Sequence, residues 1–173
     1  MKSGKMRTLR DLLVHQLRDI YYAEKQIHRA LGKSQKSAHN PALREAIAEH
    51  RDQTATHITR LETCFRAMNV PARGVRCTAV DGLVDETNET LDDAADEQVS
   101  DAALIACLQR VEHYEIAAYG CIRSFAQSTG NHKVAQLAEQ TLDEEAQTDQ
   151  LLTQIAESAV NPAALAVEGE PTR

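Results

Sequence analysis

Apolar residues recur at steps of three and four along four long stretches of the chain, the spacing that places them on one face of an α-helix. Few residues interrupt these stretches, since Pro occurs only at positions 41, 71, 162 and 171. The pattern predicts long helices at residues 8–36, 41–68, 100–129 and 132–158, with Ser100 as the N-cap of the third. A shorter amphipathic helix is predicted at residues 80–95.

The connections between the long helices are short, long and short. Asn40 and Pro41 separate the first two, Gly130 and Asn131 separate the last two, and the short helix occupies the crossover between these hairpins. This order is typical of ferritin-like bundles, whereas up-down-up-down bundles have three short loops. The sequence therefore predicts an all-α, ferritin-like four-helix bundle at residues 1–160, followed by a flexible C-terminal tail at residues 161–173.

Each long helix carries a polar residue in the middle of its apolar stripe. Glu24 interrupts the first stripe, and Glu115 takes the same place 91 residues later; His50 and Glu144 correspond in the other two helices at a shift of 94. At 1.5 Å per residue, all four lie about 20 Å from a helix end. We expect Glu24, His50, Glu115 and Glu144 to meet at one level in the core.

Ionised carboxylates are costly to bury unless they are protonated, paired or bound to a cation. No Lys or Arg occupies the centre of these stripes, so a metal ion is the remaining partner, and carboxylates with histidine suit iron or manganese. Glu112 and Gln53 lie within one turn of the central residues and join the candidate metal ligands, as do Glu145 and Asp52. Each of these four is a ligand only if its helix is rotated slightly from this register. His57 is interpreted as a packing residue. The alternative is a centre of hydrogen-bonded acids that holds no metal.

Two further features belong to the first helix. Tyr21 aligns with Glu112 in the repeat and is interpreted as a packing residue rather than a partner of the site. A second polar row follows the helix and fits either solvent exposure or a dimer interface. It consists of His15, Asp19, Tyr22 and Gln26.

Charge and hydropathy exclude two classes of function. The 173 residues carry 19 Lys and Arg against 26 Asp and Glu, and the resulting net charge of −7 is the wrong sign for holding nucleic acid through its phosphates. No apolar run approaches the roughly 18 residues that a membrane-spanning helix needs. We therefore expect a cytoplasmic protein that binds neither nucleic acid nor a membrane.

Several strings of the sequence carry a family resemblance: LRDIYYAEKQ at 17–26, HRDQT at 50–54, DAALIA at 101–106 and VEHYEIAAYG at 111–120. They resemble the YciE/YciF-type family of ferritin-like proteins over about residues 7–157. The resemblance implies a five-helix protein associated with stress responses, with a di-metal-like centre, and it implies a homodimer.

The chain departs in one respect from well-characterised di-iron bundles. Those proteins carry Glu-x-x-His on two helices, and no Glu-x-x-His occurs here; the chain offers His50-x-x-Gln53 and Glu144 with Thr148 instead. Three hypotheses remain open. The protein is a redox protein that oxidises two iron ions with oxygen or peroxide, a bundle that binds one metal ion or small ligand without turnover, or a structural or interaction module whose buried acids fix the helix register.

Overall fold

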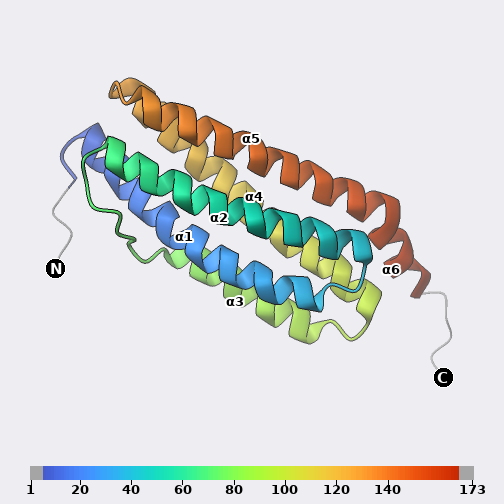
Figure 1. Cartoon of the computed structure of the whole chain (residues 1–173). Coiled ribbons are helices and arrows are strands. Elements are labelled where there is room, and N and C mark those ends of the chain that lie inside the picture. Colours follow the sequence, from blue (N-terminus) through green and yellow to red (C-terminus); the bar gives the residue numbers. More distant parts are fainter. Residues whose placement is uncertain (1–5, 168–173) are drawn as a thin grey trace.

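A computed structural model describes residues 6–167, and the secondary structure of this part of the chain is helical throughout (Figure 1). The elements in chain order are α1 (Leu9–Ser37), α2 (Pro41–Ala67), α3 (Thr78–Asp93), α4 (Glu97–Ser128), α5 (His132–Ile155), the π-helical turn η1 (Ala156–Val160) and α6 (Asn161–Val167).

The long helices form two hairpins, α1 with α2 and α4 with α5, which pack against each other (Figure 1). Asp101, at the start of α4, bonds the backbone of His39 and Asn40 just past the end of α1, so these two helices run antiparallel. Farther along, Tyr114 and Tyr119 of α4 bond to Asp19 and Glu24 of α1. The α2 and α5 helices run antiparallel and complete the ring, while α3 packs outside against α1 and α4. The predicted all-α bundle with a fifth helix in the crossover is confirmed.

Side-chain caps explain where the helices begin. Thr8 and Asp11 form a capping box at α1, and Asn40 caps α2 ahead of Pro41. The predicted cap Ser100 is wrong by one turn, because Asp96 accepts hydrogen bonds from the backbone of the first turn and starts α4 at Glu97. Asp and Ser cap helices about equally well, so the spacing of apolar residues did not distinguish them.

The α2 and α4 helices end in the same way. Asn69 and Gly130 adopt positive φ angles of 53° and 72°, and at each end the next two backbone N–H groups bond back to the last turn in a Schellman motif. One helix of each hairpin, α2 and α4, therefore ends in the same C-terminal motif.

The C-terminal region differs from the prediction. The α5 helix ends at Ile155 rather than near Ser158, and the chain continues through η1 into α6. Pro162 does not stop this helix; it is the second residue of α6 and directly follows the π-helical turn. Residues 161–167, predicted as tail, are thus helical, although none of them is buried; residues 168–173 of the predicted tail lie outside the described residues.

The second polar row of α1 is covered rather than solvent-exposed. Asp19 accepts a hydrogen bond from Tyr114 of α4, and Tyr22 donates one to Asp81 of α3. The exposed-row interpretation is therefore wrong for these residues, because the crossover helix packs over this side of α1.

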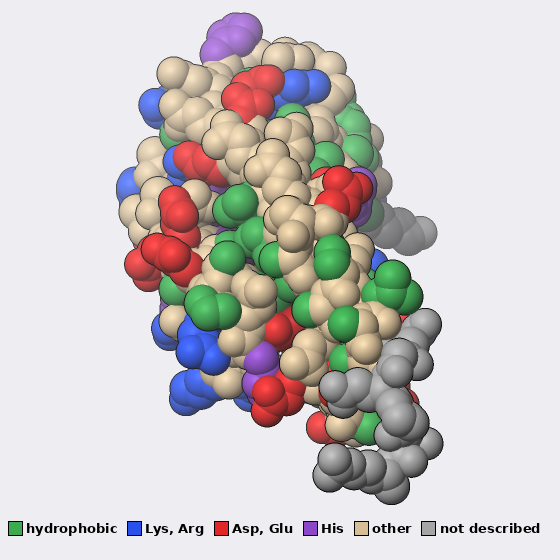
Figure 2. Space-filling model, turned by 90° about the vertical axis from the view of Figure 1, so that its right-hand side faces the viewer, with side chains coloured by type: hydrophobic (Ala, Val, Ile, Leu, Met, Phe, Trp, Pro, Cys, Tyr) green, Lys and Arg blue, Asp and Glu red, His purple; other side chains and the backbone are tan. Residues whose placement is uncertain are grey.

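None of the helices in the described part of the chain is long and apolar enough to span a membrane. On the face shown in Figure 2, apolar side chains form small groups between polar and charged ones.

Candidate metal centre

Six buried side chains from all four long helices meet in the middle of the bundle. We call them the glutamate–histidine cluster: Glu24 of α1, His50 and His57 of α2, Glu112 and Glu115 of α4, and Glu145 of α5. Each lies on the inward stripe of its helix, at a step of three, four or seven residues from its neighbours, so helical periodicity alone places it in the core.

The cluster contains two groups of potential metal ligands. In the four-residue group, His50, Glu112, Glu115 and Glu145 each offer an atom within 4.8 Å of the others; the three-residue group consists of Glu24, His57 and Glu145 on the same criterion. Glu145 belongs to both groups. Its carboxylate is therefore common to both sets of potential ligands.

The two histidines face the acids directly. The Nε2 atom of His50 lies 3.1 Å from Glu112 Oε1 and 3.9 Å from Glu145 Oε2. The Nδ1 atom of His57 lies 3.0 Å from Glu145 Oε1 and 3.6 Å from Glu24 Oε1. Both imidazoles therefore turn a nitrogen toward the carboxylates.

Most of these polar atoms make no hydrogen bond of good geometry: both oxygens of Glu112, Glu115 and Glu145, Glu24 Oε2, His50 Nε2 and His57 Nδ1. His50 Nε2 and His57 Nδ1 do lie at ion-pair distance from Glu112 and Glu145. Buried polar atoms in folded proteins are almost always satisfied, so this concentration is typical of a site that binds a further partner such as a metal ion. Four carboxylates with two imidazoles match the donor preference of iron and manganese, and the residues present fit a metal centre.

Burial and mutual repulsion raise the pKa values of the clustered glutamates. Burial raises the pKa of Glu24 and of Glu112 to about 8, and it raises the pKa of Glu115 well above its usual value. Burial also lowers the pKa of His50, whereas the carboxylates around His57 outweigh its burial and raise its pKa to about 9. Without a cation, the cluster therefore retains protons at neutral pH.

Glu144 lies outside both groups, and Glu145 takes the place predicted for it. The Glu144 side chain is 33% exposed, accepts hydrogen bonds from the Arg60 guanidinium at 2.8 and 3.0 Å, and lies 2.7 Å from His57 Nε2. Arg60 outweighs the partial burial of Glu144 and lowers its pKa. Glu144 thus holds the outer nitrogen of His57 while Glu145 faces the inner one.

The other candidates divide between the cluster and its surroundings. Glu24, His50, Glu112 and Glu115 come together as expected, whereas Gln53 is half-buried beside His50 and lines a small cavity. His57, interpreted as a packing residue, is central. Its contacts with the adjacent acids Glu144 and Glu145 on α5 and with Glu24 on α1 were not visible in one-dimensional spacing.

Two tyrosines of the core have different surroundings. Tyr21 bonds Glu62 and packs edge-on against Phe65, as a packing residue would. Tyr119, which the sequence analysis did not single out, is buried one turn after Glu115 and donates a hydrogen bond to Glu24. It fixes one oxygen of Glu24 and leaves the other free.

The cluster explains the missing Glu-x-x-His motifs. The α2 helix carries Thr54-x-x-His57 and the α5 helix carries Glu145-x-x-Thr148, so each keeps one half of the motif at an inward position. His50 and Glu112, one turn before Thr54 and Glu115, supply the additional ligands. The donor set therefore resembles that of di-metal bundles, with two positions shifted along the helices.

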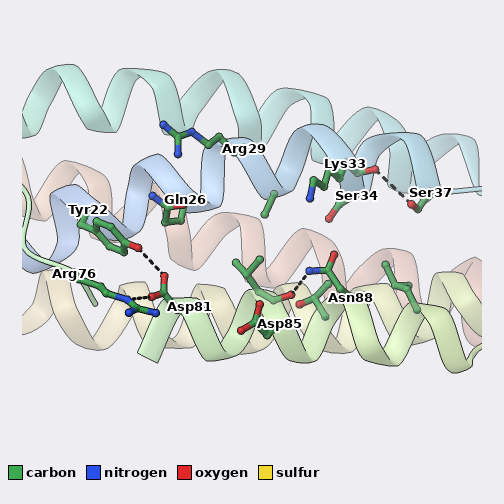
Figure 3. Close-up of a pocket in the computed structure, with 14 residues that line it drawn as sticks. Tyr22, Gln26, Arg29, Lys33, Ser34, Ser37, Arg76, Asp81, Asp85 and Asn88 are labelled. Atoms are coloured by element: carbon green, nitrogen blue, oxygen red, sulfur yellow. Dashed lines mark hydrogen bonds and ion pairs between the residues drawn. The ribbon is translucent and has the colours of Figure 1, made fainter. Parts of the chain in front are cut away.

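A larger cavity of about 490 Å³ lies between α1 and α3 and is separate from the cluster (Figure 3). Tyr22 and Arg76 both turn toward Asp81 at one end of it. Its lining contains none of the six cluster residues. The candidate chemistry is therefore not in this groove.

Comparison with known proteins gives a consistent result. The family described as Domain of unknown function (DUF892) matches residues 8–165. Protein YciF of Escherichia coli (strain K12) is 40% identical over 157 residues, which cover 90% of this chain and 95% of that protein. The crystal structure of the E. coli stress protein YciF has a TM-score of 0.86 at 40% identity and covers 90% of this chain and 99% of its own. YcfI from Rhodopseudomonas palustris, described provisionally as a structural protein, has a TM-score of 0.87 at 40% identity with the same coverage.

Proposed function

The chain belongs to the DUF892 family, which confirms its resemblance to the YciE/YciF-type proteins, and on this premise we propose that its glutamate–histidine cluster binds two divalent metal ions, iron or manganese. The observation that carries the proposal is the set of buried ligand atoms without well-formed hydrogen bonds, divided into two groups that share Glu145. We further propose that the protein acts in stress responses, because its relative YciF is a stress protein of E. coli.

The chain's own residues would hold the ions as follows. Glu24 and His57 would serve one ion, His50, Glu112 and Glu115 the other, and Glu145 both. Tyr119 and Glu144 would fix Glu24 and His57 in place from the other side, an arrangement that restricts ligand orientation in metal sites generally. Bound ferrous ions would supply electrons for the reduction of oxygen or hydrogen peroxide.

A second candidate is a structural or interaction module without metal. Two observations favour it: the raised pKa values of Glu24 and Glu112 allow the acids to stay protonated at neutral pH, and the relative YcfI is described provisionally as structural. In this case the cluster would fix helix register instead of binding ions.

Anaerobic titration of the metal-free protein with ferrous iron separates the two. We expect about two ions per chain, and absorbance from oxidised iron after oxygen or peroxide is added. The matched variants are E145Q, which removes the shared ligand, and D143N, which makes the same carboxylate-to-amide change at an exposed position of α5. We expect D143N to keep two ions and E145Q to lose at least one. Absence of binding in the wild-type protein would leave the structural module.

A further inference from the structure

The glutamate–histidine cluster is closed to solvent, so an ion can enter only where a polar cavity reaches one of its members. Glu24, His57 and Glu145 have no exposed surface, and His50 is 3% exposed. A hydrated cation cannot cross the packed apolar layers above and below, because losing its water there would cost far more than such a layer returns.

A small cavity between α2 and α5 reaches the cluster. Its volume is about 130 Å³, room for a few water molecules, and its polar lining comes from Glu49, His50, Gln53, Gln147 and Thr148. These residues form a gradient of burial: Glu49 and Gln147 are exposed, Gln53 is half-buried, and Thr148 and His50 are buried. The cavity therefore runs from solvent to a proposed metal ligand.

His50 separates this cavity from the centre. Its Nδ1 atom lies 3.3 Å from the Thr148 hydroxyl, which lines the cavity, while its Nε2 atom lies 3.1 Å from Glu112 in the cluster. The imidazole thus has one nitrogen on each side. Carboxylate, amide and hydroxyl oxygens lead up to it, and these are ligands that a divalent cation accepts in place of water.

The partly exposed side of the cluster at Glu144 carries the positive charge of Arg60. Glu144 is the half-exposed acid that contacts His57, but the Arg60 guanidinium bonds both of its oxygens and also Thr141. A cation arriving there meets a like charge. No lysine or arginine lines the cavity beside His50.

We propose that the cavity lined by Glu49, Gln53, Gln147 and Thr148 is the port through which divalent cations reach the buried cluster. This inference rests on the metal-binding function proposed above. It assigns to Gln53 a role in passage rather than in the final ligand set, and it makes His50 the first ligand that an entering ion meets.

The test is the rate of Co²⁺ uptake by the metal-free protein, followed in a stopped-flow instrument by the visible absorbance of cobalt bound to carboxylate and imidazole. Two variants place a positive charge at the port, Q147K on α5 and E49K on α2. Their matched controls make the same charge change at exposed positions away from it, Q150K on α5 and E89K on α3.

We expect both port variants to load roughly tenfold more slowly at low salt, with the difference shrinking as salt screens the added charge. The final cobalt absorbance should be the same in all five proteins, because the ligands are unchanged. Equal rates in the port and control variants would overturn the proposed port while leaving the metal site standing. Absence of a cobalt spectrum in the wild-type protein would refute the site itself, and the port with it.

Discussion

At the scale of single residues, the two groups of the cluster can be tested separately, because each contains a glutamate that the other lacks. Glu24 belongs only to the three-residue group and Glu115 only to the four-residue group. Replacing either with glutamine removes a charged ligand and adds an amide that coordinates iron more weakly. We expect E24Q and E115Q each to bind about one ferrous ion per chain, and the double variant to bind none. Anaerobic equilibrium dialysis measures this, and two ions in both single variants would contradict the assignment.

The titration of the cluster sets the pH dependence of the metal-free protein. Burial raises the pKa of Glu24 and Glu112 from 4.5 to about 8, so between these values the folded chain holds protons that the unfolded chain has released. The carboxylates around His57 outweigh its burial and raise its pKa from 6.5 to about 9. The stability that protonated His57 gives the folded chain is therefore complete below pH 6.5 and is lost as pH rises through 9. Both effects lower stability as pH rises.

We therefore expect the free energy of unfolding of the chelator-treated protein to fall steadily from about pH 5 to pH 9. Urea unfolding at intervals of one pH unit measures it. The variant with both E24Q and E112Q should show a shallower fall, because two of the titrating groups are gone. A wild-type stability that increases over this range would contradict the raised pKa values.

Four of the cluster residues could be predicted from the sequence, and two could not for a definable reason. Steps of three and four both fit a helix, so Glu144 and Glu145 suit the same stripe equally well. The pair Leu151 and Leu152 shows the same ambiguity: Leu151 is 39% exposed and Leu152 is 2% exposed. Only packing against Arg60 and His57 decides the register of α5. That these residues bind metal remains a prediction.

At the scale of elements, one buried acid forms hydrogen bonds between the two hairpins. Asp101 on α4 accepts hydrogen bonds from the backbone N–H groups of His39 and Asn40, at 2.8 and 2.6 Å, in the turn between α1 and α2. The D101A variant would leave two backbone donors unpaired, which costs about 2–3 kcal/mol. We expect this loss in urea unfolding, against a near-neutral effect for D143A at an exposed position of α5.

The helices themselves followed from local chemistry, and their ends did so only in part. Asn40 with Pro41 and the glycine at 130 are strong punctuation, and both turns lie where they were expected. Asp96 and Ser100 are equivalent as caps, and the continuation past Ser158 depends on Val160 packing into the core. Where two positions suited a helix end equally well by local preference, tertiary contacts therefore decided between them.

At the scale of the whole molecule, each hairpin supplies half of the cluster. The α1–α2 hairpin contributes Glu24, His50 and His57, and the α4–α5 hairpin contributes Glu112, Glu115 and Glu145. Both groups of ligands combine residues from the two hairpins. Bound ions would thus link the halves of the bundle and neutralise acids that otherwise repel across it.

Metal binding should therefore stabilise the whole fold and not only the site. An ion at 100 times its dissociation constant adds about 2.7 kcal/mol, so two ions would raise the melting temperature by roughly 10–20 °C in a chain of this size. The increase should be larger at pH 8 than at pH 6, because the metal-free cluster costs more stability once its acids ionise. Calorimetry with and without Mn²⁺ measures both effects. E145Q should show little of either, since it lacks the ligand shared by the two groups, and a wild-type melting temperature that Mn²⁺ leaves unchanged would contradict the coupling of metal to fold.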